Sequence, residues 1–342
     1  MKQERQLVEK IGRALGHSGQ PGNRREPRGE VRLGIGDDAA ILRLPQNREC
    51  VVSCDASIEN VHFRLATHPA DSIGYKSLVR AASDLAAMGA QPRYFLLTIA
   101  LPNKLAGRWL DDYLRGMVRA ANKLKIRAIG GDTTKARAVS ISVTVMGEVG
   151  TGKAVTRAGA RMGDYIYVSG RLGAADLGLR LTLAGLVRGS KLRALLAPHL
   201  YPEARARLGV WLASQGVASS MIDLSDGLST DLSRLCAASQ VGAKLLTEKI
   251  PAVRVPREAT NALHLGKGDA LQMALHGGED YELLFTVPPS KVKLLVGAPD
   301  HSELAQIGRI VGGGNVSILE ANGRETLLRA GGWDSFREKS NP

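Results

Sequence analysis

The chain has 342 residues, of which 44% are hydrophobic and 23% charged, as in ordinary globular proteins. Because a domain usually holds about 100–200 residues, this length predicts two domains. The 39 glycines and 14 prolines are too few for a fibrous or low-complexity chain, so those classes are excluded. The net charge of +13 is spread along the chain, and aromatic residues make up only 4%. We therefore expect a basic surface suited to small anions and no nucleic-acid partner.

The sequence also lacks the features of membrane and secreted proteins. No apolar run approaches the roughly 20 residues needed to cross a bilayer, so no membrane association is expected. The first residues, MKQERQLVEKIGRAL, are charged and amphipathic rather than a secretion signal. Cys50, Cys54 and Cys236 form a small and odd set, which fits a reducing compartment better than a disulfide scaffold. These features together predict a cytoplasmic protein.

The spacing of apolar residues predicts helices and strands in both halves of the chain. In the first half the expected helices span 2–15, 72–88 and 104–124, and the expected strands span 31–35, 39–44, 50–53, 94–101 and 138–149. In the second half the expected strands span 165–169, 219–223, 282–287 and 307–311, with helices near 173–187, 203–215 and 228–239. A glycine-rich stretch over 147–163 separates the halves. We therefore predict two α+β domains, residues 1–150 and 151–342.

The junction between the two halves nearly matches the phosphate-binding P-loop, G-x-x-x-x-G-K-[ST]. The sequence from Gly147 to Ala154 reads GEVGTGKA, so alanine replaces the hydroxyl residue that a P-loop gives to Mg²⁺. The next residues, VTRAGARMGD, have no helical apolar spacing, whereas a P-loop needs a helix N-terminus there. We therefore interpret this stretch as a loop between domains.

Aspartates beside glycines or serines recur at four places where a strand is expected to end. They lie in GIGDD (34–38), SCD (53–55), GGDTT (130–134) and IDLSDG (222–227). Glycine at such positions lets the backbone approach a ligand closely, and Mg²⁺ prefers carboxylate oxygens together with substrate phosphates. Any one of these places could be ordinary turn chemistry. Their number, without a Cys/His cluster, favours a site for Mg²⁺ and a nucleotide over a zinc site.

Four further features are candidates on weaker grounds. Asp84 lies in the expected helix within AASDLAAM, whose small side chains indicate close packing. A buried carboxylate there needs a partner, either a metal ion or a backbone hydrogen bond. Arg157 is a candidate phosphate clamp on the loop after the junction, and His62 has no Ser or Cys partner that would make it part of a nucleophilic triad. The stretch GGEDYE over 277–282 again places glycines before carboxylates.

Taken in this order, the segments resemble the thiamine-monophosphate kinases, a family of the aminoimidazole-ribonucleotide-synthetase-like (AIR-synthetase-like) superfamily. The matching stretches are GIGDDAA (34–40), SDLAAMGAQP (83–92), GGDTT (130–134), TRAGARMGD (156–164), IDLSDGL (222–228) and GGEDYEL (277–283). The resemblance implies an enzyme that uses ATP and several Mg²⁺ ions to phosphorylate thiamine monophosphate to thiamine diphosphate. It also implies an α+β fold of two AIR-synthetase-like domains, with the nucleotide between them. The N-terminal domains of two chains would form a shared β-barrel in a homodimer.

The resemblance implies roles for individual residues as well. The metal ligands would be Asp38, Ser53, Cys54, Asp55, Asp84, Asp132, Asp223 and Asp226. Gly131, Asp132, Arg157 and Ser225 would contact ATP, and Asp132, Asp226 and Arg157 would act in catalysis. His62, Glu279 and Trp333 would contact the thiamine phosphate, because a flat aromatic ring suits a cationic thiazolium. Cys54 departs from the family pattern, since it replaces a residue that gives oxygen to a metal, and Trp333 is matched on little context.

The acceptor chemistry predicts a direct transfer. A phosphate monoester has a second pKa of about 6, so it is mostly a dianion at neutral pH and needs no general base. We therefore expect in-line transfer through a loose transition state, without a phosphoenzyme.

Sister activities of the superfamily fit the sequence less well. Selenophosphate synthetase uses a reactive residue near its N-terminus, and no cysteine precedes Cys50. The hydrogenase maturation protein carries a C-terminal cysteine, whereas this sequence finishes in REKSNP. Aminoimidazole ribonucleotide synthetase shares the fold and stays possible, although it fits GGEDYEL less well. From a different class of protein, a basic nucleic-acid-binding protein that keeps the fold also stays possible.

Overall fold

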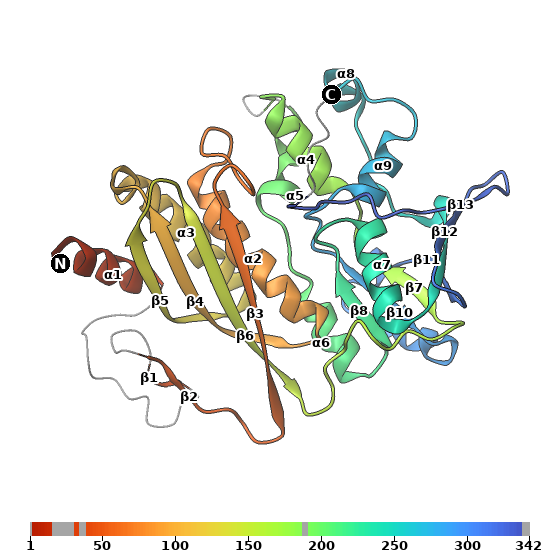
Figure 1. Cartoon of the computed structure of the whole chain (residues 1–342), viewed down its shortest axis with the longest axis horizontal. Helices are drawn as coiled ribbons and strands as arrows, with labels where there is room; N and C mark the ends of the chain where they lie inside the picture. Colours follow the sequence, from red (N-terminus) through yellow and green to blue (C-terminus); the bar gives the residue numbers. More distant parts are fainter. Residues whose placement is uncertain (1, 16–30, 34–38, 187–190, 337–342) are drawn as a thin grey trace. The chain divides into compact units, whose positions relative to one another are not determined.

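The computed structural model describes residues 2–15, 31–33, 39–186 and 191–336. The chain divides into two compact units, Met1–Ala154 and Val155–Pro342 (Figure 1). Both units combine helices with sheets, so the predicted α+β class is confirmed. Within the described ranges, none of the helices has both the length and the apolar character that crossing a bilayer requires.

The first unit is built on a four-stranded sheet in the order β3-β6-β4-β5. β6 pairs antiparallel with β3 and β4, whereas β4 and β5 run parallel. A second, two-stranded sheet joins β1 and β2. The elements are α1 (Lys2–Ala14), β1 (Val31–Leu33), β2 (Ile41–Leu42), β3 (Arg48–Ile58), α2 (Ala70–Ala87), β4 (Gln91–Leu101), η1 (Asn103–Leu105), α3 (Arg108–Leu124), β5 (Arg127–Lys135) and β6 (Ser140–Gly150).

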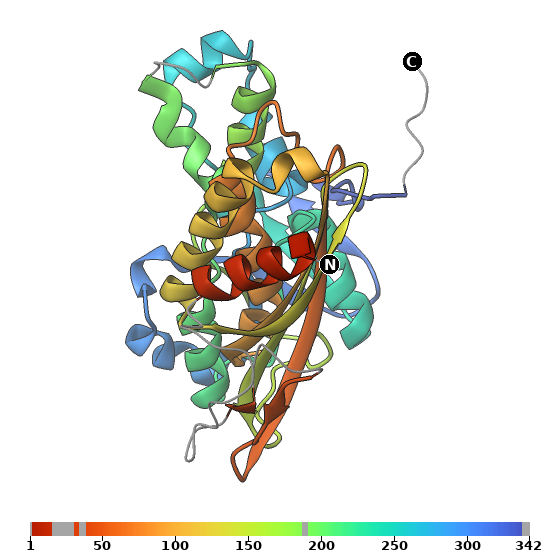
Figure 2. The same cartoon turned by 90° about the vertical axis from the view of Figure 1, so that its left-hand side faces the viewer.

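Helices cover one face of the four-stranded sheet (Figure 2). Alternate side chains of β6 point to this face, and Ile141, Val143 and Val145 are buried there, as the two-residue period of a strand requires. Helices α2 and α3 pack with their backbones in near contact. A Cβ atom added at Gly116 would lie 1.7 Å from the backbone oxygen of Asp71, so the packing of the two helices depends on this glycine.

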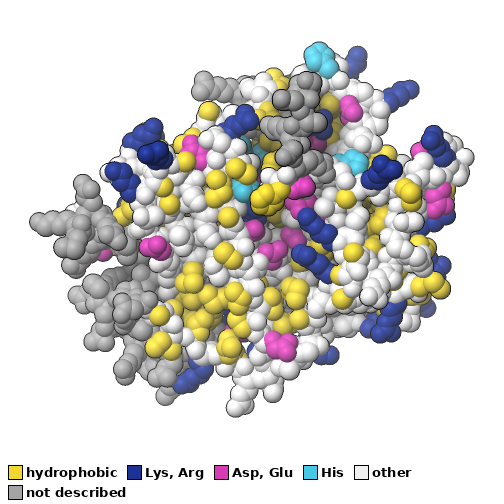
Figure 3. Space-filling model, in the orientation of Figure 1, with side chains coloured by type: hydrophobic (Ala, Val, Ile, Leu, Met, Phe, Trp, Pro, Cys, Tyr) yellow, Lys and Arg dark blue, Asp and Glu magenta, His cyan; other side chains and the backbone are white. Residues whose placement is uncertain are grey.

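The opposite face of the sheet is partly open within this unit. Val52 is 58% exposed, and its neighbours Cys54 and Ala56 on the same side of β3 are exposed as well. Strands β1 and β2 cover one end of this face, where they pack against Leu96 and Met146. Figure 3 shows hydrophobic side chains gathered over the part of the view where Figure 1 draws β3, β6 and β4. We call the set Val52, Cys54 and Ala56 the open face.

The second unit contains a seven-stranded sheet in the order β13-β12-β9-β11-β7-β10-β8. All its pairings are antiparallel except β12 with β9. Its strands are β7 (Tyr165–Val168), β8 (Ser220–Asp223), β9 (Gly242–Leu246), β10 (Leu283–Val287), β11 (Ala305–Val311), β12 (Val316–Leu319) and β13 (Glu325–Leu327). Its helices are α4 (Ala174–Leu183), η2 (Lys191–Leu196), α5 (Ala197–Leu200), α6 (Ala206–Ser214), α7 (Leu228–Ser239), η3 (Thr247–Lys249), α8 (Arg257–Ala262), α9 (Asp269–His276), η4 (Pro289–Gly297) and η5 (His301–Glu303).

The main core of the second unit lies between the sheet and α7. It joins Leu228, Leu232 and Leu235 of α7 to buried residues of the central strands, such as Ile166 and Leu284. A smaller apolar cluster packs α4 against η2 and α5. The helix predicted over 228–239 is confirmed as α7, and its spacing of three and four residues directs these leucines into the core.

Two sequence expectations about the carboxylates were wrong. Asp55 does not follow a strand, because β3 continues to Ile58, with Ala56 opposite Ser142 and Ile58 opposite Ser140. Asp132 lies inside β5 rather than at a strand end, in parallel register with Thr98 of β4. The strand was not expected around Asp132 because Gly130 and Gly131 have a low strand propensity. The long-range pairing with β4 overrides that propensity.

The junction segment contains no P-loop. After the turn at 151–152 the next regular element is strand β7, which begins at Tyr165. No helix therefore begins behind the GEVGTGKA stretch, so the P-loop is excluded. The loop interpretation is confirmed only from residue 151 onward, because Gly147–Gly150 are the last residues of β6.

Candidate functional site

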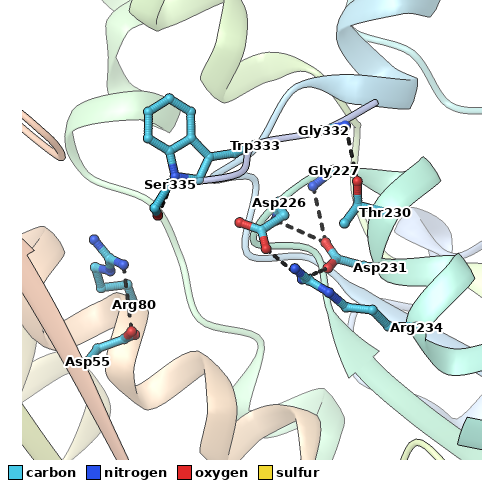
Figure 4. A network of polar contacts seen from close by, with 10 residues as sticks. All are labelled: Asp55, Arg80, Asp226, Gly227, Thr230, Asp231, Arg234, Gly332, Trp333 and Ser335. Carbon is cyan, nitrogen blue, oxygen red and sulfur yellow. Dashed lines mark hydrogen bonds and ion pairs between the residues drawn. The ribbon is translucent and has the colours of Figure 1, made fainter. Parts of the chain in front are cut away.

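Oxygen side chains of the first unit converge between β3 and α2. Ser53 and Asp55 are two residues apart on β3, so both point to the helix-covered face. The Oγ of Ser53 donates a hydrogen bond of 2.5 Å to Oδ2 of Asp84, a half-buried residue of α2. Nη2 of Arg80, one helical turn before Asp84, lies 3.6 Å from Oδ1 of Asp55 (Figure 4). Three predicted metal ligands therefore share this region, with an arginine beside them.

Cys54 lies on the other side of the strand. Its Sγ is 3.2 Å from Oγ of Ser142 and 3.4 Å from Oγ1 of Thr144, both on β6. Because adjacent residues of a strand point to opposite faces, the thiol belongs to the open face. The structure therefore does not bring the Cys54 side chain to Ser53, Asp55 and Asp84.

The predicted nucleotide contacts Gly131 and Asp132 lie on β5, where both are exposed. Gly131 has a φ of +152°, and a Cβ atom there would lie 1.9 Å from the backbone oxygen of Leu97. Both the conformation and the close approach to β4 therefore require glycine.

His62 lies in the turn that follows β3. Its Nδ1 accepts the backbone N–H of Ile58 at 3.0 Å. A neutral imidazole that accepts at Nδ1 carries its hydrogen on Nε2, so Nε2 is the nitrogen that can donate to a ligand.

In the second unit, the motif IDLSDGL runs from the last two residues of β8 to the first residue of α7. Asp223 ends β8 and is buried. Gly227 precedes the helix with a φ of +110°, a conformation that favours glycine. The carboxylate of Asp231, one turn further on, accepts the backbone N–H groups of Asp226 and Gly227 at 3.0 and 3.1 Å. A side chain of α7 therefore fixes the backbone of the turn that precedes this helix.

An arginine connects the two carboxylates of this turn. Nη1 of Arg234 lies 2.5 Å from Oδ2 of Asp226 and 2.8 Å from Oδ1 of Asp231 (Figure 4). Asp231 is fully buried, and burial raises its pKa to about 6 although the arginine and the N–H groups favour its charged form. Asp226 is the more accessible of the two, so it is the carboxylate that can meet a cation.

The motif GGEDYEL lies against this turn. The backbone N–H of Glu279 donates to the carbonyl of Ser225 at 2.8 Å, and that of Tyr281 donates to Leu224 at 2.9 Å. Glu279 has a left-handed φ of +68°, which is uncommon for a residue with a side chain. Its Oε2 lies 3.2 Å from Nδ1 of the buried His199. The predicted substrate contact Glu279 is thus held at both its backbone and its carboxylate.

The two acids after Glu279 are structural. Asp280 accepts the N–H groups of Gly173 and Ala175 at 2.6 and 3.0 Å, at the start of α4, and burial raises its pKa to about 7. Glu282 forms a two-point ion pair with Arg205, at 2.6 and 2.7 Å. The pKa of Glu282 is raised by burial, and the arginine opposes that shift.

Of the two remaining predicted residues, Trp333 lies against the same turn, whereas Arg157 lies near Ser239 at the other end of α7. The backbone N–H of Trp333 donates to the carbonyl of Asp226 at 3.0 Å, and its side chain is 51% exposed. Arg157 is exposed on the loop before β7, where Oγ of Ser239 donates to its carbonyl at 2.8 Å. The second unit therefore brings Asp223, Ser225, Asp226, Glu279 and Trp333 to one end of β8 and α7.

The sequence interpretation missed several supporting residues. Arg80 lies four residues before Asp84, and Arg234 lies three residues after Asp231, which are same-face spacings on a helix. These spacings were visible in the sequence. His199 and Arg205 pair with residues far along the chain, and no local pattern indicates such pairs. Asp38 lies outside the described residues, and in the described ranges no three His, Cys, Asp or Glu side chains are grouped closely enough to hold a metal ion.

Comparisons with known proteins define the class of the two units. The family model for the AIR synthase related protein N-terminal domain matches residues 36–149. The model for the C-terminal domain of the same proteins matches residues 161–319. The two units are therefore AIR synthase related domains.

Individual relatives define the family more narrowly. A thiamine-monophosphate kinase of Haemophilus influenzae is 38% identical over 260 residues, which is 76% of each chain. The crystal structure of thiamine-monophosphate kinase from Stenotrophomonas maltophilia has a TM-score of 0.76 and 37% identity, covering 91% of this chain and 95% of that chain. A structure of AaThiL complexed with AMPPCP and TMP has a TM-score of 0.74 and 28% identity, covering 97% and 98%. The chain belongs to the thiamine-monophosphate kinase family, whose members are enzymes.

Proposed function

We propose that this chain transfers the γ-phosphoryl group of ATP to thiamine monophosphate in a Mg²⁺-dependent reaction. The observation that carries the proposal is the turn at Ser225–Gly227. There an accessible carboxylate and a tight glycine lie beside Glu279 and Trp333, in a chain of this family. The AaThiL structure with AMPPCP and TMP supports both substrates, because those ligands are named for a relative that covers nearly the whole chain.

The donor set fits Mg²⁺. Ser53, Asp55 and Asp84 offer hydroxyl and carboxylate oxygens from one region of the first unit, and two of these oxygens already lie 2.5 Å apart. Asp132, Asp223 and Asp226 add carboxylates, and Asp38 is proposed from the resemblance alone. All are hard oxygen donors, the type that Mg²⁺ prefers, whereas Cys54 could contribute only its backbone oxygen. When bound, Mg²⁺ would neutralise charge on the phosphates.

The remaining contacts follow the chemistry of each side chain. Gly131, Arg157 and Ser225 would contact ATP, with the guanidinium of Arg157 binding phosphate oxygens. His62 would donate from Nε2 to the acceptor phosphate, since its Nδ1 is already occupied by the backbone of Ile58. Glu279 would bind the acceptor and Trp333 would lie along its cationic ring.

The proposed transfer is direct and in line. The acceptor is already a dianion at neutral pH, so no side chain has to remove a proton. The catalytic task is to hold two polyanions together, which we assign to Asp132, Asp226 and Arg157 with the bound metal. No aspartyl phosphate is expected on the protein.

The proposal includes a homodimer in the cytoplasm. The open face of the first unit presents Val52, Cys54 and Ala56, and exposed apolar patches of this kind are typical of interfaces. Val52→Lys should shift sedimentation of the protein from two chains to one. Val296→Lys in the second unit, where Val296 is 74% exposed, is the matched control and should leave the assembly intact.

The test of the activity is ADP release from the purified protein with Mg-ATP. Thiamine monophosphate, thiamine and buffer alone are compared as acceptors. ADP formed only with the monophosphate, together with thiamine diphosphate, supports the proposal. A folded protein that binds ATP but releases no acceptor-dependent ADP would refute it and favour another activity of the superfamily.

A further inference from the structure

A short segment near the C-terminus is docked on the first turn of α7 through its backbone. We call residues 330–335 the strap. Three consecutive N–H groups of the strap donate to this turn. Gly331 donates to Oγ of Ser229 at 3.2 Å, and Trp333 donates to the carbonyl of Asp226 at 3.0 Å. Gly332 donates to Oγ1 of Thr230 at 3.0 Å (Figure 4).

The strap approaches the helix so closely that side chains are excluded. A Cβ atom at Gly332 would lie 1.9 Å from the backbone oxygen of Asp226 and 2.7 Å from Oγ1 of Thr230. The φ of Gly332 lies outside the left-handed region, so its backbone could accept alanine. Glycine is therefore required at this position by space rather than by conformation.

The same turn carries the groups proposed to bind ligands. The carboxylate of Asp226 points to Arg234, while its carbonyl receives the strap. Ser229 also contacts Nδ1 of His276 at 2.9 Å, and His276 ends α9 directly before the GGEDYEL loop. The strap, the metal-binding turn and the loop that carries Glu279 therefore form one hydrogen-bonded unit.

We propose that Thr230 and Gly332 are positioning residues that hold the strap on α7 and so place the Trp333 ring for the acceptor. The inference rests on the proposed function and deepens it. The indole is half exposed, and its Nε1 donates within the strap to Ser335 at 3.3 Å. The location of the ring therefore depends on where the strap backbone is held. Thr230 supplies the hydroxyl that holds it, and Gly332 supplies the space.

Two variants test the proposal, each with a matched control. Thr230→Val removes the hydroxyl that accepts the Gly332 N–H, and Thr230→Ser restores it. Ser233→Ala is the control, since the hydrogen bond of that hydroxyl stays within α7, to the carbonyl of Ser229. Gly332→Ala introduces the clash, and Gly314→Ala is its control because nothing lies within 4 Å of a Cβ atom there.

We expect Thr230→Val and Gly332→Ala to raise the KM for thiamine monophosphate by about 3- to 10-fold, the equivalent of one lost hydrogen bond. The KM for ATP should be unchanged, and Thr230→Ser and both controls should behave like the parent protein. Amide hydrogen exchange of residues 331–333, measured on the full chain without substrates, should become faster in the two variants alone.

Separate results overturn the separate proposals. Unchanged exchange in both variants would refute the docking, and faster exchange with an unchanged KM for thiamine monophosphate would refute the positioning role. A parent protein without acceptor-dependent ADP release would refute the proposed function, while the exchange measurement would still test the docking. If Gly332→Ala does not fold, the comparison of Thr230→Val with Thr230→Ser decides the question.

Discussion

Replacing Asp280 by asparagine should change how the stability of the second unit depends on pH. Asp280 belongs to the GGEDYEL loop and is half-buried against the start of α4, where desolvation raises its pKa from 3.8 to about 7. Between about pH 4 and pH 7 the folded protein therefore keeps a proton that the unfolded chain has lost. The free energy of unfolding consequently falls as pH rises through this window. A pKa difference of about 3, at about 1.36 kcal/mol per pKa unit, is worth about 4 kcal/mol.

The assay is urea unfolding of the protein and of Asp280→Asn at pH 5 and pH 8. Trp109→Phe in both backgrounds leaves Trp211 and Trp333 as reporters, and both lie in the second unit. Asparagine has no charge at either pH and keeps one of the two acceptor contacts. The variant should therefore be less stable than the parent at pH 5. The difference should shrink by about 2.7 kcal/mol at pH 8, because about 2 of the 3 pKa units lie between these two pH values. Asp231 titrates in both proteins, so its contribution cancels in the difference between their free energies of unfolding. A constant difference between the two pH values would refute the reasoning.

Three more substitutions give expected outcomes. Asp226→Asn should lower kcat by about 100-fold or more while the circular dichroism spectrum is retained, because it removes a proposed metal ligand from an accessible position. Gly116→Ala should destabilise the first unit by about 1–3 kcal/mol or more, since the new Cβ atom would meet the Asp71 backbone at 1.7 Å. Arg205→Met should cost about 3–5 kcal/mol in urea unfolding, because it leaves the buried carboxylate of Glu282 without its cation.

These predictions have simple controls. Gly107→Ala, at the N-cap of the same helix with open space around its Cβ position, should lower the melting temperature much less than Gly116→Ala. Full activity of Asp226→Asn would contradict the metal assignment. Equal melting temperatures for Gly116→Ala and the parent would contradict the close helix contact, and an unaltered urea midpoint for Arg205→Met would contradict the buried ion pair.

Local patterns predicted the helices well and the extents of several strands poorly. The leucines of α7 repeat at helical spacing, so the sequence predicts a helix over residues 228–239, the bounds that the structure has. β5 was missed because Gly130 and Gly131 disfavour a strand, and only the parallel partner β4 makes one. Sequence spacing contains no information about such a distant partner. The same reason explains why Asp55 was expected at a strand end.

The residues of the candidate site also fall into those that local motifs predict and those that depend on distant pairing. The carboxylates beside glycines were found because each stands in a short motif, and the second unit does bring Ser225, Asp226 and Glu279 together. The groups that support them were missed where the pairing spans the fold, as for His199 with Glu279. Cys54 shows the limit of motif matching. It is adjacent to Ser53 and Asp55 in the sequence, but neighbouring residues of a strand point to opposite faces of the sheet.

The strand order of the second unit has a consequence for its synthesis. β7 is made first, yet its two neighbours in the sheet, β10 and β11, begin only at Leu283 and Ala305. β8, which ends in Asp223, joins the sheet through β10 alone. At about 5–20 residues per second, a ribosome reaches β10 roughly 10 s after β7. During that interval the apolar strand β7 has no partner, so this unit should depend on protection from aggregation while it is translated, and its ligand-binding turn should form late.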